Sequence, residues 1–267
     1  MGLSCPVVMG VINVTPDSFS DGGLHYGLDK ALRRAQEMVG EGAGLIDIGG
    51  ESTRPGARLV SVQEELDRVI PVVEAMVRQL PVPVSVDTSK VEVMREALRA
   101  GAGMINDVRA LREPGALEAL SKAGVTVCLM HMQGNPATMQ NNPSYENVVV
   151  EVKNFLASRI QACETAGIER NRIVIDPGFG FGKTLAQNLY LLKKLGDFHE
   201  LGVPLLVGLS RKSMLGAILD VPVTERLYGS LAAAVIAVWQ GATIIRVHDV
   251  KATAQVLQIC KAVMQAG

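Results

Sequence analysis

Hydrogen-bonding and charged side chains stand at the C-terminal end of each of eight short apolar runs in this sequence. In chain order they are Asn13, Asp47, Asp87, Asn106 with Asp107, His131, Asp176, residues 210–212 (Ser-Arg-Lys), and Arg246 with His248. A single residue of this kind is easily explained as the solvated end of a strand. Their recurrence at the end of every run predicts instead that they meet at one face, where they could bind a ligand and stabilise charge.

Two of these stretches carry groups suited to an anion. "DIGGESTRPGA" (residues 47–57) offers the Thr53 hydroxyl and the Arg54 guanidinium, whose planar fork matches a phosphate. A solvated arginine loop is an equally good interpretation of that stretch alone. In "IIRVHD" the two-residue spacing puts Arg246 and His248 on the same side of a strand. That geometry would allow both side chains to bind one anionic group.

Two further motifs also have simpler interpretations. "DPGFGFGKT" (residues 176–184) resembles a phosphate-binding P-loop, but Pro177 stands where that motif needs glycine. What remains is a strand that ends in Asp176, followed by a glycine-rich loop that lets backbone approach a ligand. Lys212 and Ser213 fall where a strand gives way to a helix, and a helix N-terminus attracts anions. Ser213 as a plain N-cap is the alternative.

The elements that must position these groups alternate regularly along the chain. Runs rich in Val, Ile and Leu occupy residues 7–14, 45–49, 84–87, 104–108, 125–130, 172–176, 203–209 and 243–248. They are too continuous for one-sided strands, and amphipathic helical patterns lie between them. Ser61-x-x-Glu64 and Ser89-x-x-Glu92 resemble capping boxes that begin two of these helices. We predict a single-domain (β/α)₈ barrel over residues 1–267, with a doubly wound open sheet as the competing architecture.

Composition narrows the class of ligand. The net charge of −1 provides no long-range field for nucleic acid or anionic lipid, so positive charge must be placed locally. The four cysteines form no CxxC pair and the four histidines have no zinc-site spacing. No secretory signal or membrane span is recognisable, so we expect a cytoplasmic protein with reduced thiols. The stretch "SLAAAVIAVW" (residues 230–239) is apolar nearly all round and must be covered, which favours a homodimer.

Seven motifs together resemble those of the dihydropteroate synthases, the folate-pathway enzymes inhibited by sulfonamides. They are "NVTPDSFSDGG", "DIGGESTRPGA", "VSVDTSK", "INDV", "DPGFGFGKT", "LSRKS" and "RVHD", and they occur in the family's order over essentially the whole chain. The resemblance implies a (β/α)₈ barrel, usually dimeric. It also implies that p-aminobenzoate is joined to hydroxymethyl-dihydropterin diphosphate, with Mg²⁺ present and pyrophosphate released.

The resemblance also implies a role for individual residues. The pterin edge is bound by Asp87, Asn106, Asp176, Lys212 and Arg246. The diphosphate is bound by Asn13, Thr53, Arg54, Arg246 and His248. The p-aminobenzoate is held by Phe19, Thr53, Pro55 and Ser213.

The implied reaction is dissociative, with pyrophosphate leaving before the amine attacks. Asn13 would bind the leaving group or its Mg²⁺. The catalytic residues would be Asn13, Asp87, Lys212 and Arg246. The loop over residues 15–23, with Asp17 and Asp21, would act as a lid that keeps water from the pterin cation.

Two alternatives stay open at this point. A methyltransferase of the methyltetrahydrofolate type could share the pterin-binding Asp and Asn residues, but it has no evident need of the Thr53–Pro55 loop. A non-catalytic pterin-binding protein should have lost members of the polar set, and none is visibly missing. No nucleic-acid or membrane partner is expected.

Overall fold

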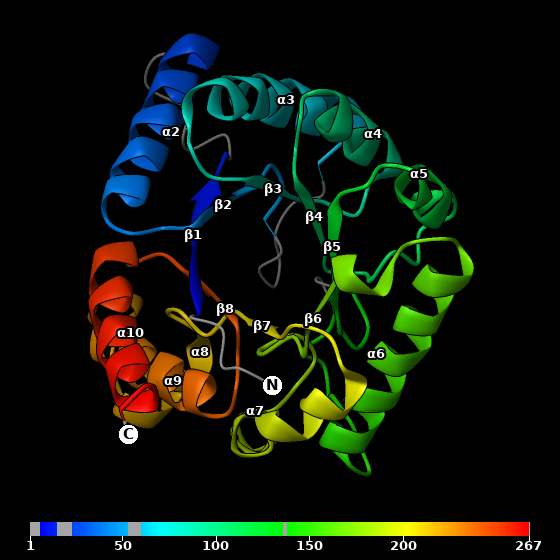
Figure 1. Cartoon of the computed structure of the whole chain (residues 1–267). Coiled ribbons are helices and arrows are strands. Elements are labelled where there is room, and N and C mark those ends of the chain that lie inside the picture. The colour runs from blue at the N-terminus through cyan, green and yellow to red at the C-terminus, as the bar shows by residue number, and fades with distance from the viewer. Residues whose placement is uncertain (1–5, 15–22, 53–59, 136–137, 267) are drawn as a thin grey trace.

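The computed structural model describes residues 6–14, 23–52, 60–135 and 138–266, and for residues 23–26 only the backbone. Within this part of the chain, eight parallel strands surround a central axis and helices form an outer ring (Figure 1). The strands are β1 (Val7–Asn13), β2 (Leu45–Gly49), β3 (Val84–Asp87), β4 (Met104–Asp107), β5 (Thr126–Met130), β6 (Ile173–Asp176), β7 (Leu206–Val207) and β8 (Ile244–Val247).

The strand order decides between the two predicted architectures. Strands β1 to β6 pair consecutively, and β8 joins β1 to β7. The remaining edge is closed by a parallel bridge between Ile175 and Leu205, in which the Ile175 N–H donates to the Pro204 carbonyl at 3.0 Å. The prediction of a (β/α)₈ barrel is therefore confirmed, and the open doubly wound sheet is wrong.

The helices follow the strands in the alternating order that the sequence pattern predicts. They are α2 (Gly23–Gly40), α3 (Val62–Gln79), α4 (Val91–Arg99), α5 (Ala116–Ser121), α6 (Val148–Thr165), α7 (Leu185–Lys193), α8 (Ser213–Leu219), α9 (Leu227–Trp239) and α10 (Val250–Met264). Short 3₁₀ turns are η1 (Arg170–Arg172), η2 (Leu195–Leu201) and η3 (Val223–Glu225). Among the described residues, no helix combines the length and apolarity that a bilayer crossing requires.

The alternation of side chains along each strand sorts the core into two parts. Outward-facing residues such as Ile46 and Ile48 pack against the surrounding helices in the main core. Inward-facing residues form a separate apolar floor inside the barrel. This floor consists of Met9, Leu45, Met104, Cys128, Val174 and Leu206, with Ile244 packed against it.

The same alternation places polar groups directly above the floor. Asp47 lies two positions beyond Leu45, Asn106 two beyond Met104, Asp176 two beyond Val174 and Arg246 two beyond Ile244. Because side chains two apart on a strand point to the same side, these four residues line the interior nearer the carboxyl ends of the strands. The apolar floor thus supports a polar layer at the mouth where (β/α)₈ barrels carry their active sites.

Two local predictions are corrected or refined. The strand predicted over residues 203–209 shrinks to Leu206–Val207. Pro204, before its start, has no N–H to donate to a neighbouring strand. Ser61 caps α3 by accepting from the Glu64 N–H at 3.2 Å, but the Glu64 carboxylate pairs with Arg68.

The predicted capping box at Ser89 is wrong. Lys90 is the N-cap of α4 and makes no side-chain cap. The Ser89 hydroxyl instead donates to Asp107, a carboxylate contributed by the next strand. A tertiary partner has therefore replaced the local one.

The loop after β6 requires glycine at position 178. Gly178 has φ of 71°, and a Cβ built there would lie 1.9 Å from the His131 carbonyl oxygen. Gly167 has φ of 92°, but a Cβ added there would have no atom within 4 Å. An alanine at position 167 would therefore meet only the backbone strain of a positive φ, without the steric overlap found at position 178.

We predict that Gly178→Ala lowers the free energy of unfolding by more than about 3 kcal/mol, because strain and overlap add. Gly167→Ala should cost only about 1 kcal/mol, the preference for glycine at positive φ alone. Urea unfolding of the two variants measures the difference. Equal losses would show that the loop yields freely at Gly178.

Candidate active site

Arg246 lies at the centre of the polar layer and joins three strands. From β8, its Nε donates to Asp47 Oδ2 on β2 at 2.6 Å, and its Nη2 donates to Asp87 Oδ2 on β3 at 2.9 Å. Asn106 on β4 also reaches Asp47 Oδ2, with its Nδ2 at 3.2 Å. Four of the polar residues at the ends of predicted strands therefore form one connected group across the barrel.

Burial and charge together set the protonation of this group. Burial raises the pKa of Asp87 to about 7, with the Arg246 charge opposing the rise and the Asp47 charge adding to it. Burial alone would lower the pKa of Arg246, but the Asp47 and Asp87 carboxylates raise it above its ordinary value. A permanent guanidinium charge thus faces a carboxylate that can change its charge near neutral pH.

Asp176 and Lys212 approach one another on the other side of the layer. Asp176 is buried at the end of β6, and its Oδ1 accepts the Gly178 N–H at 2.7 Å. Burial raises the pKa of Asp176, against the Gly178 hydrogen bond and the charge of Lys212. The Lys212 ammonium lies 4.3 Å from the centre of the Phe181 ring, which is a cation–π distance. Lys212 therefore stands between the glycine-rich loop and α8.

Asn13, His248 and Ser213 lie at the rim of the same mouth. Asn13 is the last residue of β1 and is exposed beside Gly49, the last residue of β2. The His248 Nδ1 lies 3.0 Å from the Ser210 hydroxyl, which also accepts the His248 N–H at 3.2 Å. Ser213 is the first residue of α8 and is exposed, while Lys212 is the N-cap. The interpretation of Ser213 as a plain N-cap is therefore wrong.

Some polar residues predicted at strand ends do not face the interior. Asp107 is the outward neighbour of Asn106, and its carboxylate accepts the N–H groups of Arg109 and Leu111 at 2.8 and 2.7 Å. Arg211 pairs with Asp249, through Nε and Oδ2 at 3.0 Å. These two residues stabilise loops rather than join the polar layer.

His131 also points outward, and it belongs to a buried cluster that the sequence did not predict. The Lys183 ammonium is 2% exposed and donates to the Gly178 and Phe181 carbonyls at 2.8 and 3.1 Å. His131 Nδ1 lies 3.0 Å from the same ammonium, and burial lowers the His131 pKa to about 3, so its neutral ring can accept. Lys183 thus ties the glycine-rich loop to the end of β5.

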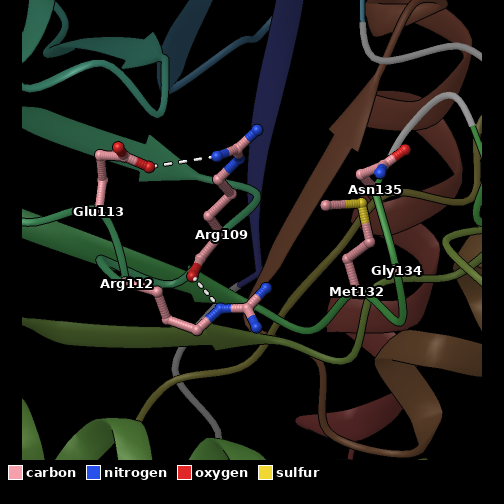
Figure 2. Close-up of a pocket in the computed structure, with 6 residues that line it drawn as sticks. All are labelled: Arg109, Arg112, Glu113, Met132, Gly134 and Asn135. Atoms are coloured by element: carbon pink, nitrogen blue, oxygen red, sulfur yellow. Dashed lines mark hydrogen bonds and ion pairs between the residues drawn. The ribbon is translucent and has the colours of Figure 1, made fainter.

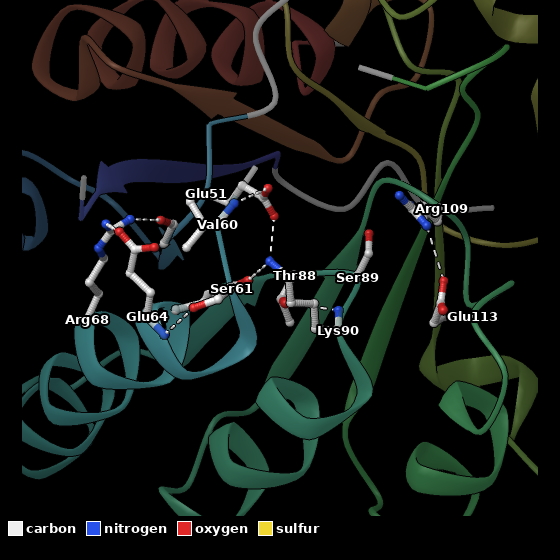
Figure 3. A network of polar contacts seen from close by, with 12 residues as sticks. Glu51, Val60, Ser61, Glu64, Arg68, Thr88, Ser89, Lys90, Arg109 and Glu113 are labelled. Atoms are coloured by element: carbon white, nitrogen blue, oxygen red, sulfur yellow. Dashed lines mark hydrogen bonds and ion pairs between the residues drawn. The ribbon is translucent and has the colours of Figure 1, made fainter. Parts of the chain in front are cut away.

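A second polar network flanks the residues that follow β2 (Figure 3). The Lys90 ammonium contacts Glu51 Oε2 at 2.7 Å and Glu65 Oε2 at 2.5 Å. The other Glu51 oxygen accepts the Val60 N–H at 3.1 Å. This hydrogen bond connects the segment before residues 53–59 to the segment after them. No local pattern in the sequence signals this network, because its members are 9 to 39 residues apart.

A cavity of about 390 Å³ opens beside the ends of β4 and β5 (Figure 2). It is lined by Arg109, Arg112, Glu113, Met132, Gly134 and Asn135. Arg109 pairs with Glu113 at 3.1 Å, and the Arg112 Nε donates to the Arg109 carbonyl at 3.0 Å. None of the six lining residues is among the predicted site residues.

Six predicted site residues lie outside the described residues: Asp17, Phe19, Asp21, Thr53, Arg54 and Pro55. In the described part of the chain, no group of three or more His, Cys, Asp or Glu side chains could hold a metal ion. An amide oxygen such as that of Asn13 fits Mg²⁺ only if most of the metal's ligands come from a bound phosphate and water.

We predict that Lys183→Met lowers the free energy of unfolding by about 2–4 kcal/mol, since two carbonyls and a ring nitrogen lose their donor in a buried setting. Lys153→Met is the control. Lys153 pairs at 2.8 Å with Glu200, which is 72% exposed, and such a pair is worth less than about 1 kcal/mol. Thermal and urea unfolding compare the two variants. Equal stability losses would refute the anchoring role of Lys183.

Comparisons with known proteins identify the family of this chain. A family model described as "Pterin binding enzyme" matches residues 9–248. The dihydropteroate synthase of Escherichia coli (strain K12) is 57% identical over 266 residues, covering 100% of this chain and 94% of that protein. That of Haemophilus influenzae is 54% identical over 266 residues, covering 100% and 97%.

Solved structures show the same similarity in three dimensions. The Yersinia pestis dihydropteroate synthase in a sulfonamide drug complex has a TM-score of 0.94 and 57% identity, covering 100% of this chain and 97% of that one. The Xanthomonas albilineans enzyme in complex with 7,8-dihydropteroate has a TM-score of 0.90 and 50% identity, covering 100% and 97%. This chain belongs to the dihydropteroate synthase family of pterin binding enzymes.

Proposed function

We propose that this chain joins p-aminobenzoate to hydroxymethyl-dihydropterin diphosphate, forming 7,8-dihydropteroate and pyrophosphate in the folate pathway. The observation that carries the proposal is the Arg246 guanidinium, held between Asp47 and Asp87 with Asn106 beside it, in a chain similar to dihydropteroate synthases over its full length. The relatives named above are dihydropteroate synthases, and they give the methyltransferase alternative no support.

The pterin is recognised through its amino-pyrimidinone edge, which presents donors beside acceptors. Asp87 and Asp176 accept from the donors, Asn106 pairs with the remaining edge, and Lys212 donates to an acceptor of the ring. Support comes from the burial of Asp176 and Asn106 above the apolar floor. A ligand that left these buried polar groups without hydrogen bonds would bind weakly, so the site selects a ligand with matching donors and acceptors.

The diphosphate lies toward Arg246, Asn13 and His248, with Thr53 and Arg54 completing its contacts. Support comes from the position of Asn13 and His248 at the rim of β1 and β8, which are neighbouring strands. Mg²⁺ bound by Asn13 and the diphosphate oxygens would neutralise charge on the leaving group. The p-aminobenzoate carboxylate is received at Ser213, with Phe19, Thr53 and Pro55 beside its ring.

The reaction begins when the bond between the pterin methylene carbon and the diphosphate oxygen breaks. The electron pair leaves with pyrophosphate, and the positive charge on the methylene spreads into the ring. Arg246 stabilises the departing anion, and ionised Asp87 stabilises the cation. The amine of p-aminobenzoate then attacks the methylene and loses a proton. The loop with Asp17 and Asp21 keeps water from the cation until that bond forms.

The protein acts as a homodimer in the cytoplasm. Support for the dimer comes from large apolar side chains exposed on neighbouring helices. They are Tyr228, Ile236 and Trp239 on α9, and Ile259 and Val263 on α10. Such a surface favours a covering subunit. The cytoplasmic location is supported by Cys128, Cys163 and Cys260, which are buried free thiols.

The proposal is tested by pyrophosphate release from the pterin diphosphate with Mg²⁺, with and without p-aminobenzoate, and with a sulfonamide added. We expect release that is coupled to p-aminobenzoate and suppressed by the sulfonamide. Asp176→Ala should lower kcat/KM by roughly 10⁴-fold, since the pterin donors lose their buried acceptor. Tight pterin binding without turnover in the wild type would favour a binding protein instead.

A further inference from the structure

Asp47 contacts two other members of the polar layer, although the sequence predicts no substrate contact for it. Its side chain is completely buried on β2, above Leu45 of the floor. One of its oxygens, Oδ2, accepts both Arg246 Nε at 2.6 Å and Asn106 Nδ2 at 3.2 Å. Asp47 therefore holds two of the proposed substrate-binding residues at once, from below.

We propose that Asp47 is a positioning residue, which holds Arg246 and Asn106 in the orientation that the pterin diphosphate requires. The proposal rests on the proposed function, because the positions matter only if those two side chains bind substrate. Asp47 itself is not a catalytic residue, since it lies beneath the groups that would touch the pterin.

The physical basis is a competition for the guanidinium fork. An arginine and a carboxylate prefer a bidentate pair in which two N–H groups meet two oxygens. Asp87 alone could draw Arg246 into such a pair. Because Asp47 holds Nε, only Nη2 reaches Asp87, at 2.9 Å. Two carboxylates on different strands thus fix the direction in which the other guanidinium N–H groups point, and Asn106 keeps an acceptor for its amide.

The charge of Asp47 gives a second, measurable consequence. The charged groups that act on Asp87 are Arg246 on β8, Asp47 on β2, Asp107 on β4 and Glu65 on α3. Arg246 lowers the pKa of Asp87, whereas the three carboxylates raise it. Removing the Asp47 charge should therefore lower the pKa of Asp87 from about 7 and keep it ionised in more acidic solution.

Asparagine at position 47 separates geometry from charge. In the described part of the chain, the other oxygen of Asp47, Oδ1, is buried and has no hydrogen-bond partner. An amide NH₂ can take the place of Oδ1 without displacing a donor, and the amide oxygen can stay near Arg246 and Asn106. Asp47→Asn therefore keeps the contacts and removes the charge, whereas Asp47→Ala removes both.

The experiment is steady-state pyrophosphate release, with pterin diphosphate and p-aminobenzoate, at pH values from about 5 to about 9 for the wild type and three variants. In the wild type, kcat/KM should fall as pH drops below about 7, because Asp87 becomes protonated. Asp47→Ala should lower kcat/KM at least about 100-fold, as expected when a reacting group is displaced by an ångström. Asp47→Asn should lower kcat/KM less than Asp47→Ala does. Its kcat/KM should also begin to fall at a lower pH than in the wild type, which shifts the acidic limb of the pH profile.

Asp107→Asn is the matched control. Asp107 is also completely buried, but its contacts are with Ser89 and with the backbone of Arg109 and Leu111. This variant should lower Tm, leave KM for the pterin diphosphate unchanged, and move the limb less than Asp47→Asn does.

Each outcome decides the matter. Wild-type kcat/KM in folded Asp47→Ala overturns the positioning role. A pH profile of Asp47→Asn that superimposes on the wild type overturns the effect of the Asp47 charge on Asp87. If Asp47→Ala does not fold, Asp47→Ser takes its place, because its shorter side chain also loses the contacts with Arg246 and Asn106. Absence of pyrophosphate release in the wild type overturns the proposed function and this inference together, whereas an active wild type with unaltered variants overturns this inference alone.

Discussion

A buried positive charge shared by two carboxylates is the constraint on which the rest of the site depends. Arg246 reaches Asp47 and Asp87 across the barrel interior, from strands that are far apart in the sequence. A guanidinium buried without a partner would be costly, and so would either carboxylate. The three groups are therefore stable only together, and their mutual geometry is fixed. That rigidity lets the site present charge in a set position to a substrate.

The barrel supplies what this ion cluster requires. Its apolar floor excludes water from below, so the charges interact through a medium of low polarity. The strands place Asp47, Asn106, Asp176 and Arg246 on their inward side, each two residues beyond a floor residue. On the far side, the Lys183 ammonium ties the glycine-rich loop to the end of β5. Phe181 in that loop then lies beneath Lys212.

Much of this could be predicted from the sequence, since strand ends and side-chain alternation are local patterns. The strands and the inward residues Asp87, Asn106, Asp176 and Arg246 followed from such patterns and from ordered motifs. The hydrogen-bond partner of each polar side chain could not be predicted in this way, because it depends on which residues the fold brings together. Arg246 and Asp47 are 199 residues apart. The Ser89 hydroxyl binds Asp107, 18 residues away, rather than capping its own helix.

The misplaced residues have a common cause. His131 directly follows Met130, and Asp107 directly follows Asn106. Because neighbouring side chains on a strand point to opposite sides, His131 and Asp107 point outward although both lie at strand ends. Polarity at a strand end therefore predicts the mouth of the barrel but not which side chains face its interior. Lys183 was hidden within a motif whose other members were more conspicuous, and nothing local reveals that three acceptors converge on it.

The planar fork of Arg246, and not merely its charge, organises the site. The most direct test is kcat/KM for pyrophosphate release in Arg246→Lys, compared with Arg34→Lys on α2, where the arginine pairs with Glu37 and Glu41 at the surface. A lysine ammonium cannot replace the planar fork that bonds to Asp47 and Asp87 together, so we expect a loss of at least about 100-fold. Arg34→Lys should match the wild type. Wild-type kcat/KM in Arg246→Lys would show that a positive charge alone is sufficient at this position.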